Sequence, residues 1–293
     1  MSTVAPMQHE IVPRKDLQFR LDSEDIPRYW LGGDPYRTRF FDAMSTLFPE
    51  GEKYFIECVR DYRDQVTDPV QQEQVRDFIF QEAQHGRVHT LFNNRLKDQG
   101  IDVDSLLDEQ KRVLGWYRRK MPKAWNLAQT AAAEHMTALM AHFFLEHREE
   151  LADGDPRVRA IYFWHAVEEI EHKAVAFEVL TKVAKASYFT RVLAMLWESL
   201  NFPFHTFLIM RYMFNVDGLK GWRRVKTVLR GMWWLYGPRG IYMRMMPHYL
   251  AYYLPGYHPW KRGGMDAYGE WRRAYDRHEG DPVTAAEEFL RAA

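Results

Sequence analysis

A Glu-x-x-His unit occurs twice in this sequence, and few folds can accommodate both copies. The first unit runs from Glu82 to His85, and the second runs from Glu169 to His172. Residues three apart lie on one face of an α-helix, so each unit presents a carboxylate beside an imidazole. The neighbouring positions on both faces are apolar, and burying such groups without partners would cost several kcal/mol. The donors therefore need a common partner, and a metal ion meets that need.

Further polar residues lie on or near the same helices. His165 lies four residues before the glutamate of the second unit, and His89 lies four residues after the histidine of the first. We expect His165 to be a ligand, and His89 to be either a ligand or a group that orients one through a hydrogen bond. His135 is expected to be a packed or polar residue near the site, with a ligand role as the alternative. Glu168 and Glu171 are expected to face neighbours on their own helix or solvent.

Di-metal helical bundles also take one inward glutamate from each of two further helices. Upstream of the first unit, Glu52 shares its helical face with apolar residues, whereas Glu57 shares its face with charged ones, so Glu52 is the better candidate. Upstream of the second unit, Glu134 follows three alanines that leave room for close helix packing. Each glutamate is separated from its unit by a turn that ends in Asp-Pro, at 68–69 and 155–156, and Asp-Pro predicts a helix start.

The ligand pattern resembles the di-iron carboxylate proteins of the ferritin-like superfamily. The additional His165 resembles the seven-ligand variant found in arylamine N-oxygenases. The motifs at 48–52, 81–85 and 164–173 also resemble a bacterial family of predicted metal-dependent hydrolases, over roughly residues 20 to 260. These resemblances imply an all-α fold, a ferritin-like four-helix bundle with additional C-terminal helices. The predicted metal ligands are Glu52, Glu82, His85, Glu134, His165, Glu169 and His172.

The donor types indicate which metal such a site prefers. Four carboxylates with two or three imidazoles suit iron or manganese, and would also bind zinc. The only cysteine is Cys58, so the sequence offers neither a thiolate site nor a disulfide framework. We therefore predict two iron ions, with manganese or zinc as alternatives, bridged by carboxylates at roughly 3.5 to 4 Å from each other. A metal-free set of buried salt bridges would need cations on the glutamate faces, which carry none.

Helical periodicity and turn residues divide the chain into three parts. Residues 1–36 are predicted to form an N-terminal arm, 37–186 the di-metal four-helix bundle, and 187–293 an aromatic-rich helical extension packed on it. The bundle helices are expected at 51–66, 69–98, 123–151 and 156–186, after a short helix at 37–48. Residues 101–122 form the crossover, with a helix at 103–116, and residues 265–293 are expected to form two short helices.

Charge and composition limit the possible partners. The 40 basic and 40 acidic residues balance, which argues against nucleic acid. There is no N-terminal leader pattern and no uncharged run of about 18 residues, so a cytoplasmic protein without a transmembrane helix is expected. Aromatic residues make up 15% of the chain and are abundant in residues 187–260. That segment is predicted to close a substrate channel or form a homodimer interface, with peripheral membrane contact as the alternative.

Three functions are compatible with such a site. We favour a di-iron oxidoreductase or oxygenase that uses O2 and an unknown electron donor to oxidise a hydrophobic small molecule. The alternative is a di-metal hydrolase in which a metal-bound water attacks an ester or phosphoester. No cationic phosphate clamp lies on the ligand faces, because the nearest candidate, Arg87, is one position away. A metal store is the third possibility, and the long aromatic extension argues against it.

Overall fold

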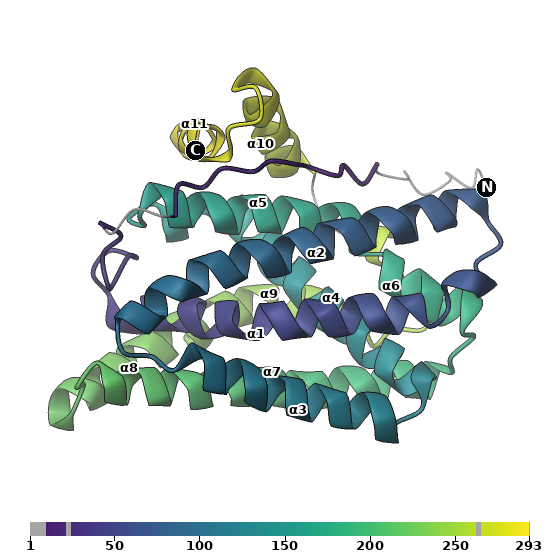
Figure 1. The fold of residues 1–293 in the computed structure, drawn as a ribbon, viewed down its shortest axis with the longest axis horizontal. Helices are drawn as coiled ribbons and strands as arrows, with labels where there is room; N and C mark the ends of the chain where they lie inside the picture. Colours follow the sequence, from purple (N-terminus) through teal and green to yellow (C-terminus); the bar gives the residue numbers. More distant parts are fainter. Residues whose placement is uncertain (1–9, 22–24, 262–264, 293) are drawn as a thin grey trace.

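The computed structural model describes residues 10–21, 25–261 and 265–292. Within these ranges the regular secondary structure is helical, apart from one isolated bridge between Leu31 and Gly154, which confirms the predicted all-α class. The long helices lie roughly along one axis of an elongated molecule (Figure 1). The α-helices are α1 Pro35–Arg60, α2 Pro69–Asp98, α3 Val103–Lys120, α4 Lys123–Glu146, α5 Pro156–His172, α6 Val175–Glu178, α7 Tyr188–Val216, α8 Gly221–Tyr236, α9 Ile241–Ala251, α10 Asp266–Arg277 and α11 Pro282–Arg291. Short 3-10 turns lie at Arg63–Gln65, Arg148–Leu151 and Pro259–Lys261, and a π-helical turn at Val179–Val183.

Helices α1, α2, α4 and α5 form a four-helix bundle. Helix α1 packs against α2 and α4, and α5 packs against the same two helices from the other side. The Asp-Pro starts are confirmed at α2 and α5, where Asp68 accepts backbone hydrogen bonds from Val70 and Gln71, and Asp155 accepts one from Arg157. These caps fix where two site-bearing helices begin, and therefore the height of their donors in the bundle.

Helix α1 continues through Pro49, whereas the sequence predicted two separate helices at 37–48 and 51–66. Proline lacks an N–H group, so the carbonyl four residues earlier loses its usual helical partner. Here that carbonyl belongs to Ser45, and the side-chain amide of Asn93 on α2 donates to it at 2.8 Å. A neighbouring helix thus supplies the missing hydrogen bond, which removes one reason for the helix to break.

The helix predicted at 156–186 is also wrong in extent. Helix α5 ends at His172, and α6 begins only at Val175 before the π-helical turn. The break follows directly after the last histidine of the second Glu-x-x-His unit. Helix α4 likewise ends at Glu146, where 151 was expected, because the last residues of that segment form a 3-10 turn. The crossover helix α3 is longer than predicted and reaches Lys120.

Part of the N-terminal arm covers α5. Its residues 1–9 and 22–24 lie outside the described part of the chain, but residues 10–21 run as an extended segment over α5, beneath α10 and α11 (Figure 1). Arg14 of this segment donates to Glu168 at 2.9 Å and to Glu171 at 2.6 Å. Both glutamates are fully buried, so the expectation that they face solvent or their own helix is wrong. The cation that pairs with them, Arg14, lies about 150 residues earlier in the sequence. Helical spacing indicates neighbours on one helix, so it cannot predict this pair.

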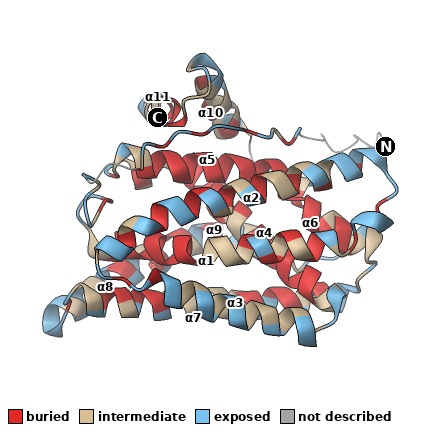
Figure 2. Ribbon diagram, viewed as in Figure 1, coloured by how far each residue is buried: buried red, intermediate tan, exposed pale blue. Residues whose placement is uncertain are grey.

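Helices α7, α8 and α9 form the extension against the bundle. Helix α7 packs on α1 and α4, and α8 packs on α1 and α9. By length and composition alone α7 could span a membrane. The sequence predicts no such helix, because charged residues interrupt this segment. One such helix is weak evidence, and only 28% of its apolar window is buried. Burial is nearly continuous along α5, whereas α7 and α8 alternate between buried and exposed positions (Figure 2).

Candidate metal centre

His172 lies at the junction of three predicted carboxylate ligands. Its Nε2 atom is 3.0 Å from Glu82 Oε1 and 3.4 Å from Glu134 Oε2. The same atom is 3.6 Å from Glu169 Oε1. All four side chains are buried, and they come from α2, α4 and α5. One donor cluster therefore draws on three of the four bundle helices.

The remaining predicted ligands extend this cluster on the α1 side. His85 Nδ1 lies 3.7 Å from Glu169 Oε1, and His165 Nε2 lies 2.9 Å from the same oxygen. His165 Nε2 is also 3.9 Å from Glu52 Oε1. Sets such as Glu52, Glu82 and His85 place one donor atom each within 4.8 Å of one another, which is compatible with a shared ion. All seven residues predicted as ligands thus lie in one buried cluster.

Several donor atoms in this cluster are buried and make no hydrogen bond. They are both carboxylate oxygens of Glu52 and of Glu82, together with His85 Nδ1, Glu134 Oε2 and His172 Nε2. Buried polar atoms are almost always satisfied, so this concentration of unsatisfied donors and acceptors needs an explanation. Metal ions would satisfy them directly, since carboxylate oxygens and imidazole nitrogens are iron, manganese and zinc ligands. The residues present therefore fit a metal centre.

The carboxylates and imidazoles of the cluster shift one another's pKa values. Burial lowers the pKa of His172, but Glu169, Glu134 and Glu82 outweigh burial and raise it well above its usual value. Burial, followed by repulsion from the Glu82 carboxylate, raises the pKa of Glu52 well above its usual value. Burial and the Glu169 carboxylate raise the pKa of Glu134 to about 7. Burial lowers the pKa of His85, which keeps its imidazole neutral, as a metal ligand must be. Two divalent cations would balance the charge of four carboxylates, and among the described residues the ion-pair partners of these four glutamates are histidines.

Histidine side chains in the cluster are held from behind by hydrogen bonds. His89 Nε2 lies 2.7 Å from His165 Nδ1, and His89 Nδ1 lies 2.8 Å from the Ser45 hydroxyl. His85 Nε2 lies 3.1 Å from Glu168 Oε2, so the carboxylate accepts from that ring nitrogen. Such outer contacts fix the ring orientation of a ligand. His89 therefore has the position of an orienting residue, although it also lies within reach of an ion shared with Glu52 and His165.

Sequence reasoning missed several residues that support the donors. Gln81 accepts a hydrogen bond from His172 Nδ1 at 2.9 Å, which aims the opposite ring nitrogen at the carboxylates. Gly86 faces α1, where a Cβ atom would lie 3.3 Å from Glu52 Oε2. The sequence could have indicated this contact, because a glycine inside a helix often marks a place where a neighbouring segment packs closely. The role of Gln81 had no signal, because its partner lies on another helix.

Two other candidates lie away from the cluster. The ring of His135 stacks on Tyr252, and its Nδ1 lies 3.0 Å from the Tyr257 hydroxyl. Burial lowers the pKa of His135 to about 3, so it is a neutral histidine of α4 that packs against residues of the C-terminal half. Glu57 is only partly buried and pairs with Arg118 at 3.5 Å. The sequence preference for Glu52 over Glu57 agrees with this placement.

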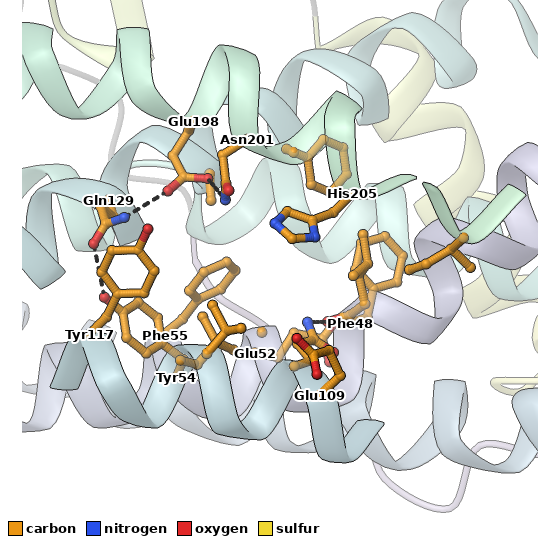
Figure 3. A pocket seen from close by; sticks show the side chains of 18 of the residues that line it. Phe48, Glu52, Tyr54, Phe55, Glu109, Tyr117, Gln129, Glu198, Asn201 and His205 are labelled. Carbon is orange, nitrogen blue, oxygen red and sulfur yellow. Dashed lines mark hydrogen bonds between the residues drawn. The ribbon is translucent and has the colours of Figure 1, made fainter. Parts of the chain in front are cut away.

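An apolar pocket leads to the α1 side of the cluster. It has a volume of about 330 Å³ and is lined by residues of α1, α3, α4 and α7. Glu52 and Thr137 contribute to its wall, and the Thr137 hydroxyl donates to Glu169. On the opposite side, Glu198 accepts a hydrogen bond from Gln129 at 3.1 Å (Figure 3). None of the described residues that line the pocket is lysine or arginine.

Comparison with known proteins gives one family assignment. No curated protein and no solved structure matches the chain. A family model described as predicted metal-dependent hydrolase matches residues 13–263, which include every residue of the donor cluster. That description indicates a metal-dependent enzyme and supports the hydrolytic alternative better than the favoured oxidoreductase. The chain belongs to this family of predicted metal-dependent hydrolases.

Proposed function

We propose that the chain is a dinuclear metal enzyme that hydrolyses an ester-type bond of an apolar small molecule bound in the pocket. The observation that carries this proposal is the position of Glu52. Its carboxylate belongs to the donor cluster, and its side chain also lines the apolar pocket. A substrate in that pocket would therefore contact the metal centre at the α1 side of the bundle.

The metal ions would supply a water molecule of lowered pKa and polarise the carbonyl oxygen of the substrate. The residues of the chain would hold the ions, orient the ligands and position the substrate. Glu52, Glu82, Glu134 and Glu169, with His85, His165 and His172, would hold the ions. The Thr137 hydroxyl orients Glu169 from the pocket side. The predominantly apolar lining would exclude bulk water and position an apolar chain.

The pocket also favours one class of ester. A phosphoester would bring negative charge close to Glu52 and Glu198, and the described lining residues include no lysine or arginine to offset it. A carboxylic ester carries no such charge. We therefore expect esters of apolar acids to be better substrates than phosphoesters.

A second candidate is O2-dependent oxidation by two iron ions. The donor set favours it, because four carboxylates with histidines from two Glu-x-x-His units match the helical di-iron pattern. The ferritin-like relationship and the likeness to arylamine N-oxygenases are part of this second proposal. The substrate would still be an apolar molecule in the same pocket, and a separate electron donor would be needed.

One set of assays separates the two reactions. The full chain is loaded anaerobically with ferrous iron, manganese or zinc, and turnover of p-nitrophenyl esters of increasing acyl length is measured with and without O2. Hydrolysis predicts turnover with manganese or zinc, independent of O2, and rising with acyl length. Turnover or O2 consumption that occurs only with iron would overturn hydrolysis in favour of oxidation.

A pocket variant tests where the substrate binds. Val113→Trp on α3 places a large ring in the pocket lining, whereas Val70→Trp adds the same ring at an exposed position of α2. We expect the first variant to lose activity on long acyl chains while its metal content stays unchanged. The second variant should behave like the parent. Equal activity of both variants on all chain lengths would place the substrate elsewhere.

A further inference from the structure

The outer surface of α7 and α8 carries large apolar side chains that contact little of the protein. Six of them define what we call the outer apolar face: Phe189, Leu200, Phe204, Trp222, Leu229 and Trp233. Phe189, Leu200, Trp222 and Trp233 keep 72%, 74%, 75% and 69% of their surface exposed. Both helices lie along the lower edge of the molecule in Figure 1. Isolated exposed apolar residues are common, but exposed apolar residues that recur along two neighbouring segments of one edge indicate an interaction surface.

These residues follow the periodicity of their helices. Leu200, Phe204 and Leu208 lie at intervals of four along α7, so they share one side of the helix. The opposite side of α8 is held tightly to the bundle, because Gly231 packs directly against the Tyr36 ring of α1, where no Cβ atom would fit. The exposed side of α8 is therefore the outward side of a firmly docked helix.

The same region carries a strong positive charge in a chain that is neutral overall. Residues 188–261 contain ten lysines and arginines and two acidic residues, the buried Glu198 and Asp217. Asp217 is neutralised within the fold, since Arg39 donates to it at 2.6 Å and Arg28 at 2.8 Å. Helix α8 itself contributes the exposed Arg223 and Lys226, and no acid. The α8 part of the outer apolar face is thus accompanied by exposed basic residues.

We propose that this face docks on an anionic lipid surface. Tryptophan and arginine favour the membrane interface, apolar side chains enter the acyl boundary, and lysine and arginine bind acidic headgroups. A second copy of the chain fits less well, because it would bring two basic faces together. Nucleic acid would match the charge, but it would leave Leu200, Phe204 and Leu229 without an apolar partner.

The pocket adjoins this face through Leu208. This side chain is 44% exposed on the outer side of α7, and it also lines the apolar pocket that reaches Glu52. Docking would therefore bring the Leu208 side of the pocket close to the lipid. This part of the inference rests on the proposed function, and it names the substrate class as an acyl compound that partitions into the bilayer.

Vesicle co-sedimentation of the full chain tests the docking. The probes are phosphatidylcholine vesicles with and without phosphatidylglycerol, at low and at high salt. We expect binding to the anionic vesicles that salt weakens, and much weaker binding to the neutral ones. Reversal of charge at Arg223, Lys226 and Arg230 to glutamate should weaken binding at least about tenfold.

Matched variants separate this surface from the rest of the protein. Trp222→Ser with Trp233→Ser should also weaken binding, whereas Leu91→Ser at an exposed site of α2 should not. A control with Arg63, Arg76 and Arg291 changed to glutamate removes as much positive charge from other exposed sites. If that control loses as much binding as the α8 variant, the attraction depends on net charge and the proposal is wrong.

Two further outcomes would overturn the proposal. One is a failure to bind anionic vesicles. The other is a concentration-dependent dimer that Trp222→Ser with Trp233→Ser abolishes, which would show that a second copy covers the face. Docking needs no metal, so binding that survives chelation while activity is lost separates this inference from the proposed function. A third assay presents a long-chain ester in vesicles. If the protein hydrolyses soluble esters but not this one, the assignment of a bilayer substrate is wrong, whereas the docking proposal stands.

Discussion

The interior of the bundle and the outer face of α7 and α8 place side chains in opposite environments. Inside, carboxylates and imidazoles lie in an apolar surrounding, and the seven clustered donors are nearly inaccessible to water. Outside, tryptophan, phenylalanine and leucine point into water beside basic residues. Each arrangement is unfavourable for the chain alone. Each therefore indicates a missing partner, which we propose to be metal ions inside and lipid outside.

Substitutions in the two regions should also differ in how much they lower the free energy of unfolding. A buried polar residue is fixed by several partners, so its removal leaves other buried groups unpaired. An exposed apolar residue has few contacts to lose.

Removal of the Arg14 guanidinium should have the largest effect on stability. Arg14→Met leaves the buried carboxylates of Glu168 and Glu171 without their cation, which typically costs about 3–5 kcal/mol. Urea unfolding of the metal-free chain measures the loss. Arg20→Met is the matched control, because Arg20 forms an exposed ion pair with Asp281, and a change below about 1 kcal/mol is expected. Equal effects would mean that the arm contributes little to the fold.

Glu198 should make stability depend on pH. Burial raises its pKa to about 7, so the folded state favours the protonated form. Its contribution is fully present below the unfolded pKa near 4.5 and is lost as pH rises towards 7. Glu198→Gln should remove roughly 3 kcal/mol of this pH dependence. Urea unfolding midpoints between pH 4.5 and 7.5 measure this pH dependence. Glu57→Gln is the control, because Glu57 is partly exposed. If Glu198→Gln and the parent show identical pH profiles, the raised pKa of Glu198 is contradicted.

Loss of the orienting hydrogen bond from His89 should weaken metal binding without abolishing it. His89→Phe removes the contact to His165 Nδ1, and changes of this kind typically cost about 10–100-fold in metal affinity. Competition with a chromophoric chelator measures the affinity. His278→Phe changes a surface histidine that pairs with Glu288 and should have no effect. Complete loss of metal would instead make His89 a ligand.

Substitutions on the outer apolar face should change stability least. Leu200→Ser alters an exposed side chain, so its unfolding free energy should stay within about 0.5 kcal/mol of the parent. Phe92→Ala in the bundle interior is the comparison and should cost about 3–5 kcal/mol. Chemical denaturation of both variants tests the contrast. A large loss from Leu200→Ser would indicate that the face is buried in solution.

Local signals predicted much of this architecture. The limits of α2 follow from Asp68-Pro69 and Gly100, and the seven clustered donors follow from helical spacing on apolar faces. Two of the failures involve partners distant in sequence. Helix α1 continues through Pro49 because Asn93 on another helix binds the freed carbonyl. The pairing of Arg14 with Glu168 and Glu171 joins the arm to α5, and no pattern within either segment indicates it.

Metal stoichiometry decides whether the donor cluster is a dinuclear metal centre. The full chain is loaded anaerobically with ferrous iron, manganese or zinc, desalted, and analysed for metal per chain. The account predicts two ions per chain for the metal that binds best, and a loss of both in a Glu82→Gln, Glu169→Gln variant that remains folded by circular dichroism. A parent protein that retains no metal, or a variant that retains as much as the parent, would contradict it.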